Sequence, residues 1–413
     1  MRSALLLSMP PLGLLLLIAA CTGPESQTGT RFEADRSPNV PGAPDDYVPT
    51  PGGWWYHRSC VHAIDEGARV DRNHVVHRRD GTTFPIPKCA YRAYRVRPGA
   101  QPPPPADNGW IEWADVQEPV GNWFSQQNAN WTVPSAPLTS YGSGQVYYTF
   151  PGVQSDSFIL QPVLQYGTSP AGGGNNWALA SWQCDGPSGY CAHSTPLITA
   201  LAGDAITGTV ASSACSNGVC TWTITALDVT SGQRTVLTTT DTANYFDGVG
   251  ASLEVYGVTT CDQYPRSGVF FTGISLYDRY SNLVSPSWST HLQSGLSPAC
   301  NFQVATTSTS VTLYQNRPPS ATVSGPTDIT QAGNYTWTAN PSGGVGGYMY
   351  SWQYRDAYNP NWVGAGGTQS VSKFVDASTA SWFDYKVTVT SGDQTGFGSV
   401  HVISELGQCN PFC

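Results

Sequence analysis

The sequence has few charged residues and no helical periodicity. Only 11% of its 413 residues are charged, against about a quarter in an ordinary soluble domain, and no segment shows an apolar period of 3.6 residues. Basic residues are also scarce, with 19 Lys and Arg against 28 Asp and Glu. Because phosphate binding requires a basic face, we expect no nucleic-acid partner. C-x₂-C and D-x-D-x-D-G patterns are missing as well, so we expect no metal and no other cofactor.

Glycine, proline and aromatic residues are plentiful instead. The chain contains 43 Gly and 32 Pro, and 12% of it is aromatic. Residues 221–226 alternate strictly between threonine and apolar residues, which is the pattern of a half-buried strand. Similar runs recur between turn signals, giving some ten strands over about 200 residues. This pattern of short alternating strands and turns predicts an all-β protein built on a two-sheet sandwich or jelly roll.

The first residues resemble an export signal. Arg2 precedes an apolar run that ends in Ile18-Ala19-Ala20-Cys21, which resembles the lipobox of bacterial lipoproteins. We therefore predict a signal peptide over 1–20, lipidation of Cys21 and a flexible tether over 21–52. The lipid would hold an exported protein on the bacterial outer membrane or cell surface. The alternative is a plain secretory signal that is cleaved after Ala20.

The other ten cysteines form neighbouring pairs, as expected in an oxidising compartment. In the best-supported pair, Cys215 and Cys220 flank Asn217-Gly218, a strong type I′ hairpin signal that would place both cysteines opposite each other. The remaining pairs rest on proximity alone, and zinc binding is their rival interpretation. The predicted disulfides are Cys60–Cys89, Cys184–Cys191, Cys215–Cys220, Cys261–Cys300 and Cys409–Cys413.

Composition divides the remainder into four segments. Residues 53–99 hold about half of the basic residues and form a basic, disulfide-stapled cap or prosegment, and 100–107 form a Pro-rich linker. Residues 108–315 form the large β domain. Residues 316–413 form a terminal module that, around Gly343, Gly344 and Trp352, resembles bacterial immunoglobulin-like modules. We expect a monomer.

Several motifs of the large domain follow one another in a familiar order. They are Gly121-Asn122-Trp123, Asn130-Trp131-Thr132-Val133-Pro134, Ile159-Leu160-Gln161, Ala202-Gly203-Asp204-Ala205-Ile206 and Leu253-Glu254-Val255. Over roughly residues 120–260 this order is similar to the fungal glutamic peptidases, or eqolisins. The resemblance implies a concanavalin-like jelly roll with a Gln/Glu catalytic dyad, followed here by an immunoglobulin-like sandwich.

By this resemblance Glu254 is the general base that activates a water and then protonates the leaving amine, while Gln161 holds the water and stabilises the oxyanion. Gln165 competes with Gln161 for that role. The groove residues would be Trp177, Trp182, Gln165 and Tyr256. The implied function is an exported, membrane-anchored acid endopeptidase with polypeptide substrates. The alternative is a non-catalytic surface protein whose jelly roll binds carbohydrate or peptide.

The basic cap has two interpretations. As a prosegment, its cationic side chains would dock on an acidic groove and be released at low pH, when carboxylates become protonated. Alternatively, the cap is a permanent structural addition that only extends the sandwich.

Overall fold

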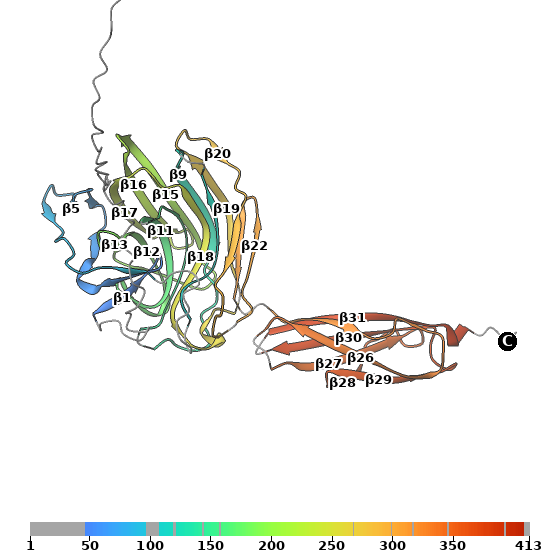
Figure 1. The fold of residues 1–413 in the computed structure, drawn as a ribbon. Coiled ribbons are helices and arrows are strands. Elements are labelled where there is room, and N and C mark those ends of the chain that lie inside the picture. The colour runs from blue at the N-terminus through green and yellow to red at the C-terminus, as the bar shows by residue number, and fades with distance from the viewer. Residues whose placement is uncertain are drawn as a thin grey trace, which may run out of the picture. The chain divides into compact units, whose positions relative to one another are not determined.

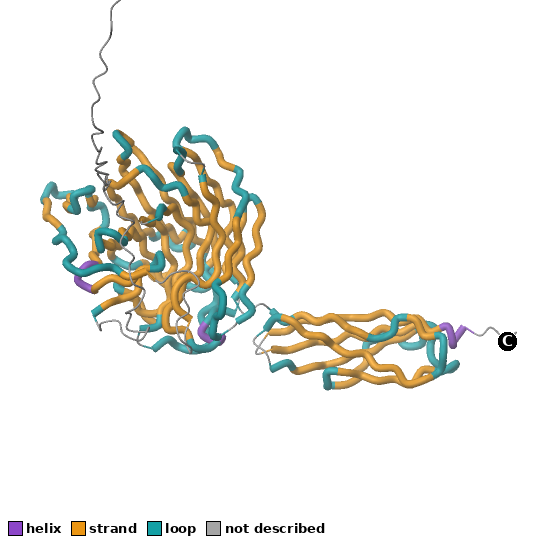
Figure 2. The backbone as a smooth tube through the Cα atoms, viewed as in Figure 1, coloured by secondary structure: helices purple, strands orange, loops and turns teal. Residues whose placement is uncertain are grey.

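The structure is a computed structural model with strands as nearly all of its regular elements. It describes residues 46–95, 107–118, 121–142, 144–156, 158–266, 268–298, 300–315, 318–344, 347–391 and 394–408. The signal peptide, Cys21 and the Cys409–Cys413 pair lie outside these ranges. The described helices are three short 3₁₀ segments, η1 (Arg58–Cys60), η2 (Cys261–Gln263) and η3 (Glu405–Gln408) (Figure 2). In the described part of the chain, no helix is long and apolar enough to cross a membrane. The predicted all-β fold is confirmed.

Two large, mainly antiparallel sheets pack face to face (Figure 1). The first has the order β21 (Ser289–Leu292), β8 (Asp107–Gln117), β18 (Asp247–Val258), β10 (Val146–Gln154), β11 (Phe158–Ser169), β12 (Gly172–Asp185), β13 (Tyr190–Thr195) and β3 (Val61–Asp65), and β14 (Ile198–Ala200) pairs with β12. The second has the order β22 (Gln303–Thr307), β23 (Ser310–Tyr314), β19 (Val269–Asp278), β9 (Phe124–Thr132), β15 (Ala205–Ser216), β16 (Val219–Asp228), β17 (Arg234–Thr242), β4 (Arg69–Val70), β5 (Val75–His77) and β6 (Thr83–Pro85), and β20 (Leu283–Val284) pairs with β19.

Local sequence explains how these strands form and where they turn. In β16, Trp222, Ile224 and Ala226 are fully buried between the sheets while the threonines between them are half-buried. The hairpin from β15 to β16 turns at Asn217 and Gly218, which have φ values of 50° and 74°, as a type I′ turn requires. Alternating burial on both sheets therefore builds one shared apolar core.

The cap is joined to the large domain by strand pairing. β3 pairs with β13 in parallel and so extends the first sheet, while β4 pairs with β17 in parallel and extends the second. A small third sheet has the order β1 (Tyr47–Thr50), β2 (Trp54–His57) and β7 (Tyr94–Arg95). Residues 47–52, predicted as the end of a flexible tether, thus belong to the folded cap. They fold because Trp55 and Tyr56 bury their rings against the first sheet.

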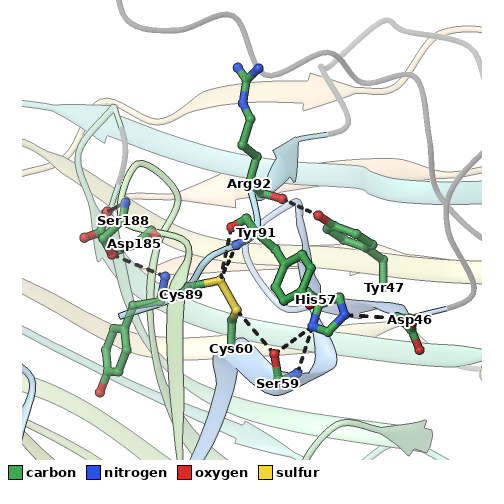
Figure 3. Close-up of a disulfide and its surroundings, with 11 residues drawn as sticks. Asp46, Tyr47, His57, Ser59, Cys60, Cys89, Tyr91, Arg92, Asp185 and Ser188 are labelled. Carbon is green, nitrogen blue, oxygen red and sulfur yellow. Dashed lines mark hydrogen bonds and ion pairs between the residues drawn. A yellow bond between two sulfur atoms is a disulfide. The ribbon is translucent and has the colours of Figure 1, made fainter. Parts of the chain in front are cut away.

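Four predicted disulfides are confirmed, namely Cys60–Cys89, Cys184–Cys191, Cys215–Cys220 and Cys261–Cys300. Figure 3 shows Cys60–Cys89, which closes the cap. Beside it, the Tyr91 ring stacks on His57 at 3.7 Å. Gly189 lies in the turn between β12 and β13, where an added Cβ would come within 3.3 Å of Cys89 Sγ. These bonds agree with an oxidising compartment.

The terminal module is a smaller sandwich with its own core. One sheet has the order β24 (Ser320–Ser324), β26 (Gly333–Ser342) and β29 (Ser370–Val375). The other has the order β25 (Asp328–Ile329), β31 (Gln394–Ser404), β30 (Trp382–Ser391), β27 (Met349–Asp356) and β28 (Val363–Gly366). Trp352 is buried among Trp337, Tyr385 and Val387, so this tryptophan packs in the core of the module.

Candidate functional site

Gln161 and Glu254 lie on the same face of the first sheet. Glu254 is on β18 and Gln161 is on β11, with β10 between the two strands. The neighbours of Glu254 along its strand, Leu253 and Val255, point into the inter-sheet core. Side chains alternate along a strand, so Glu254 points away from the second sheet, toward the cap.

The Glu254 carboxylate is fully buried and accepts three hydrogen bonds. Its Oε2 accepts from the backbone N–H of Gly52 at 2.6 Å, and its Oε1 accepts from the N–H of Gly53 at 2.9 Å. Oε1 also accepts from the Tyr256 hydroxyl. Two of the three donors therefore come from the cap, and the third comes from the same strand as Glu254.

Gln161 reaches the same short segment of the cap. Its Nε2 donates to the Pro51 carbonyl at 2.7 Å, while no described donor reaches its buried Oε1. The Pro51–Gly52 peptide group is thus held at both ends: its carbonyl faces Gln161 and its N–H faces Glu254. The structure brings the two side chains together around one backbone unit, although they are 93 positions apart in the sequence.

The segment fits this place because of its glycines and the aromatic residues that follow. Gly52 and Gly53 have φ values of 108° and 81°, a region that glycine enters without steric cost. A Cβ on Gly52 would lie 2.7 Å from Ile159 Cγ2. Trp55, only 1% exposed, packs edge-on against Tyr256 at 5.0 Å. The cap therefore presents bare backbone to the polar side chains and anchors that backbone with a buried indole.

Burial raises the pKa of Glu254 to about 7, and the hydrogen bonds from Tyr256, Gly52 and Gly53 act in the opposite direction. The carboxyl group can therefore exist both with and without its proton near neutral pH. A group that must accept a proton and later return it needs this property.

The other predicted groove residues divide between two faces. Trp182 and Tyr256 are buried on the face of Gln161 and Glu254, in the cluster that the cap covers. Gln165 shares that face, but its amide donates to the Gly172 carbonyl and accepts from Ser169, within the β11–β12 hairpin. Trp177 instead lies between the sheets, against Tyr147 and Tyr166. Its placement in the groove was wrong, because five positions separate it from Trp182 and an odd spacing reverses the face.

Two features of this region were not predicted. The first is the Pro51–Gly53 segment itself, which the sequence marks by Gly52-Gly53 directly before Trp54 and Trp55. The second is another buried glutamate, Glu112, whose Oε1 accepts from Gln315 at 3.3 Å between the sheets. Burial raises the pKa of Glu112 well above its usual range. Glu112 is enclosed in the core, so it has no route to a macromolecular substrate.

The contacts that hold the cap over Gln161 and Glu254 are not those between cationic side chains and an acidic groove. Glu254 meets backbone amides, and the cap arginines Arg58, Arg78 and Arg79 are exposed. Within the described ranges, no cluster of three or more His, Cys, Asp and Glu could hold a metal ion. No model of a known protein family matches this chain, and a search of curated proteins finds no match either.

Proposed function

We propose that this protein is an exported acid endopeptidase in which Glu254 and Gln161 act as a catalytic dyad. The observation that carries the proposal is that both side chains hold a single peptide group, Pro51–Gly52, from its two ends. Peptide hydrolysis by an activated water needs a donor at the carbonyl oxygen and a proton-exchanging group near the carbonyl carbon and the leaving nitrogen. Gln161 supplies the first and Glu254 supplies the second.

In this proposal, Glu254 removes a proton from a water molecule that attacks the substrate carbonyl carbon. The carbonyl oxygen becomes an oxyanion, which the Gln161 amide stabilises by donating a hydrogen bond. Glu254 then gives the proton to the departing amine, so the carboxylate is regenerated. The pKa of about 7 applies to the covered site, where burial raises it. Departure of the cap would expose the carboxyl group to water, remove that effect and restore the carboxylate that the first step requires at acid pH.

The same contacts make the described form a latent one. Gly52 and Gly53 contact the carboxylate directly, where a water and a substrate would have to lie. We therefore interpret residues 46–95 as a prosegment that leaves before catalysis. Lipidation at Cys21 would keep the protein on the outer membrane or cell surface, and polypeptides would be its partners.

The proposal can be tested by comparing alanine variants of Gln161 and Gln165, which both lie on β11. A specific protease site is inserted between Arg95 and Asp107, the purified full chain is cut, and the cap is removed by gel filtration in mild denaturant. Casein hydrolysis is then followed between pH 3 and pH 7. Removal of one oxyanion donor lowers kcat about 10²–10³-fold, so Gln161→Ala should lose most activity. Gln165→Ala, on the same face, should stay within a few-fold of the parent. Equal rates for both variants would refute the assigned role of Gln161.

One observation favours a non-catalytic alternative. A buried carboxylate with three donors is also how a structural glutamate would anchor the cap, and Trp182, Tyr148 and Tyr256 would then offer an aromatic surface to a glycan or peptide. A released protein that is inert from pH 2 to pH 7, yet binds peptides or oligosaccharides in calorimetry, would establish this function instead.

A further inference from the structure

A cavity lies at the seam between the cap and the large domain, away from Glu254. Its volume is about 210 Å³. The cap contributes residues of the turn between β4 and β5, and the large domain contributes β12, β13 and β17. The polar side chains that matter here are Arg72, His74, Gln183, Asp185, Tyr190 and Asp241.

Two carboxylates face this cavity without a cationic partner. Asp185 is 8% exposed, and the hydrogen bond to its side chain comes from the Ser188 amide at 3.3 Å. Asp241 Oδ2 accepts from Gln183 at 2.6 Å and from the Tyr245 hydroxyl at 3.1 Å, and its Oδ1 accepts from the Thr242 N–H at 2.6 Å. Neither carboxylate forms an ion pair with any side chain that the structure describes. Burial raises the pKa of both groups, to about 6 for Asp185.

Two buried polar atoms in the same wall have no partner within the described structure. Gln183 is 5% exposed, and its Nε2 is committed to Asp241, so its Oε1 must point elsewhere; no donor reaches it. Tyr190 is 3% exposed, and its hydroxyl is close enough to Asp185 and Asp241 for both to raise its pKa, yet it bonds to neither. Unpartnered buried polar atoms are uncommon, and here they surround one space.

We propose that this cavity binds a small organic cation, an ammonium or guanidinium group, between Asp185, Asp241 and Gln183. Such a group carries several N–H donors and no acceptor, which matches a wall of two carboxylates and an amide oxygen. The stacked rings of His74 and Tyr190, 4.2 Å apart, supply an aromatic side to the space, which cations also favour. The cation could be a free amine or the side chain of a peptide lysine or arginine.

The basic side chains that line the cavity do not neutralise the two carboxylates. Burial lowers the pKa of His74, so this imidazole is neutral at neutral pH and leaves the carboxylates uncompensated. Arg72 is exposed at the rim and pairs with neither carboxylate in the described structure. Because His74 belongs to the cap and Asp185 to the large domain, a bound cation would hold the two together and stabilise the covered form.

The test uses the uncut full chain and calorimetric titration at pH 7.5. The probes are agmatine, N-acetyl-arginine amide and the uncharged isostere N-acetyl-citrulline amide, with CaCl₂ as a separate arm. We expect at least one cation to bind and the citrulline compound to bind at least tenfold more weakly. Binding of agmatine alone indicates a free amine, whereas binding of the arginine amide indicates a peptide side chain. Equal binding of the citrulline compound, or binding of calcium alone, would overturn the proposal.

Two variants locate the site. Asp185→Asn should weaken binding of the cation more than tenfold, while Asp328→Asn, the same change in the terminal module, should not alter it. If Asp185→Asn does not fold, Arg72→Gln serves instead, because removal of a like charge from the rim should strengthen binding several-fold. Unchanged affinity in the folded variant used would place the cation elsewhere and refute the proposal.

Discussion

The buried Glu254 makes the stability of the covered form depend on pH in a definite direction. Its pKa is about 7 in the folded protein and 4.5 in an unfolded chain, so the folded form binds the proton more tightly. The contribution of protonated Glu254 to the free energy of unfolding is complete below pH 4.5 and disappears as the pH rises through 7. A pKa difference of this size corresponds to about 3 kcal/mol.

Glu254→Gln removes this titration and allows the effect to be isolated. Asp185 titrates in the same direction as Glu254, whereas the depressed pKa values of His62, His74 and His193 act oppositely. These groups remain in both proteins and cancel in the difference if the sites are independent. The free energy of unfolding should therefore fall by about 3 kcal/mol more in the parent than in the variant between pH 4.5 and pH 8.

Guanidinium-induced unfolding of the full chain, followed by tryptophan fluorescence at the two pH values, measures this difference. Glu405→Gln makes the same substitution on an exposed residue of the terminal module and should leave the pH dependence unaltered. If the parent and Glu254→Gln show parallel pH profiles, the carboxyl group is not buried beneath the cap and the reasoning fails. The predicted sign also opposes acid release of the cap through Glu254, so any acid release must come from groups with depressed pKa values, such as His62, His74 and Asp71.

Two other predictions concern stability. Gly52→Ala should destabilise the covered form by about 1–3 kcal/mol, because the position combines a positive φ with a close contact. Gly81→Ala, at a positive φ with open space around it, should cost less. Equal denaturation midpoints for the two variants would show that the contact is unimportant. Replacing both cysteines of a disulfide by serine should lower the free energy of unfolding by about 4 kcal/mol for Cys261–Cys300 and about 2 kcal/mol for Cys215–Cys220. The first bond closes a loop of 39 residues and the second a loop of 5. The reverse order in urea unfolding would contradict the chain-entropy argument.

Local patterns were sufficient for much of the sandwich. The alternation of residues 221–226 and the Asn217-Gly218 turn predicted β16 and its hairpin, because both depend on neighbouring residues only. Neighbouring cysteines identified the four described disulfides for the same reason. The pairing of β3 with β13 and of β4 with β17 could not be derived in this way, because parallel pairing joins segments that are distant in the sequence.

The covered site shows where sequence reasoning ended. The alternation of residues 253–255 determines the face of Glu254, but its burial depends on residues 47–55, of which composition assigned residues 47–52 to a spacer. Pro51, Gly52 and Gly53 are typical of linkers, and only the non-local packing of Trp55 on Tyr256 turns them into a folded segment. Trp177 was misplaced although its odd spacing from Trp182 already carried the necessary information.

The central claim is that Glu254 exchanges protons with a water that attacks a peptide bond. The most direct test is the pH–rate profile of casein hydrolysis by the cap-released parent and by cap-released Glu254→Gln, with substrate binding measured in parallel. We predict that the parent cleaves casein at acid pH and that Glu254→Gln is at least about a hundredfold slower, with its binding retained. Equal rates in the two proteins, or a parent that binds casein without cleaving it at any pH, would contradict the account.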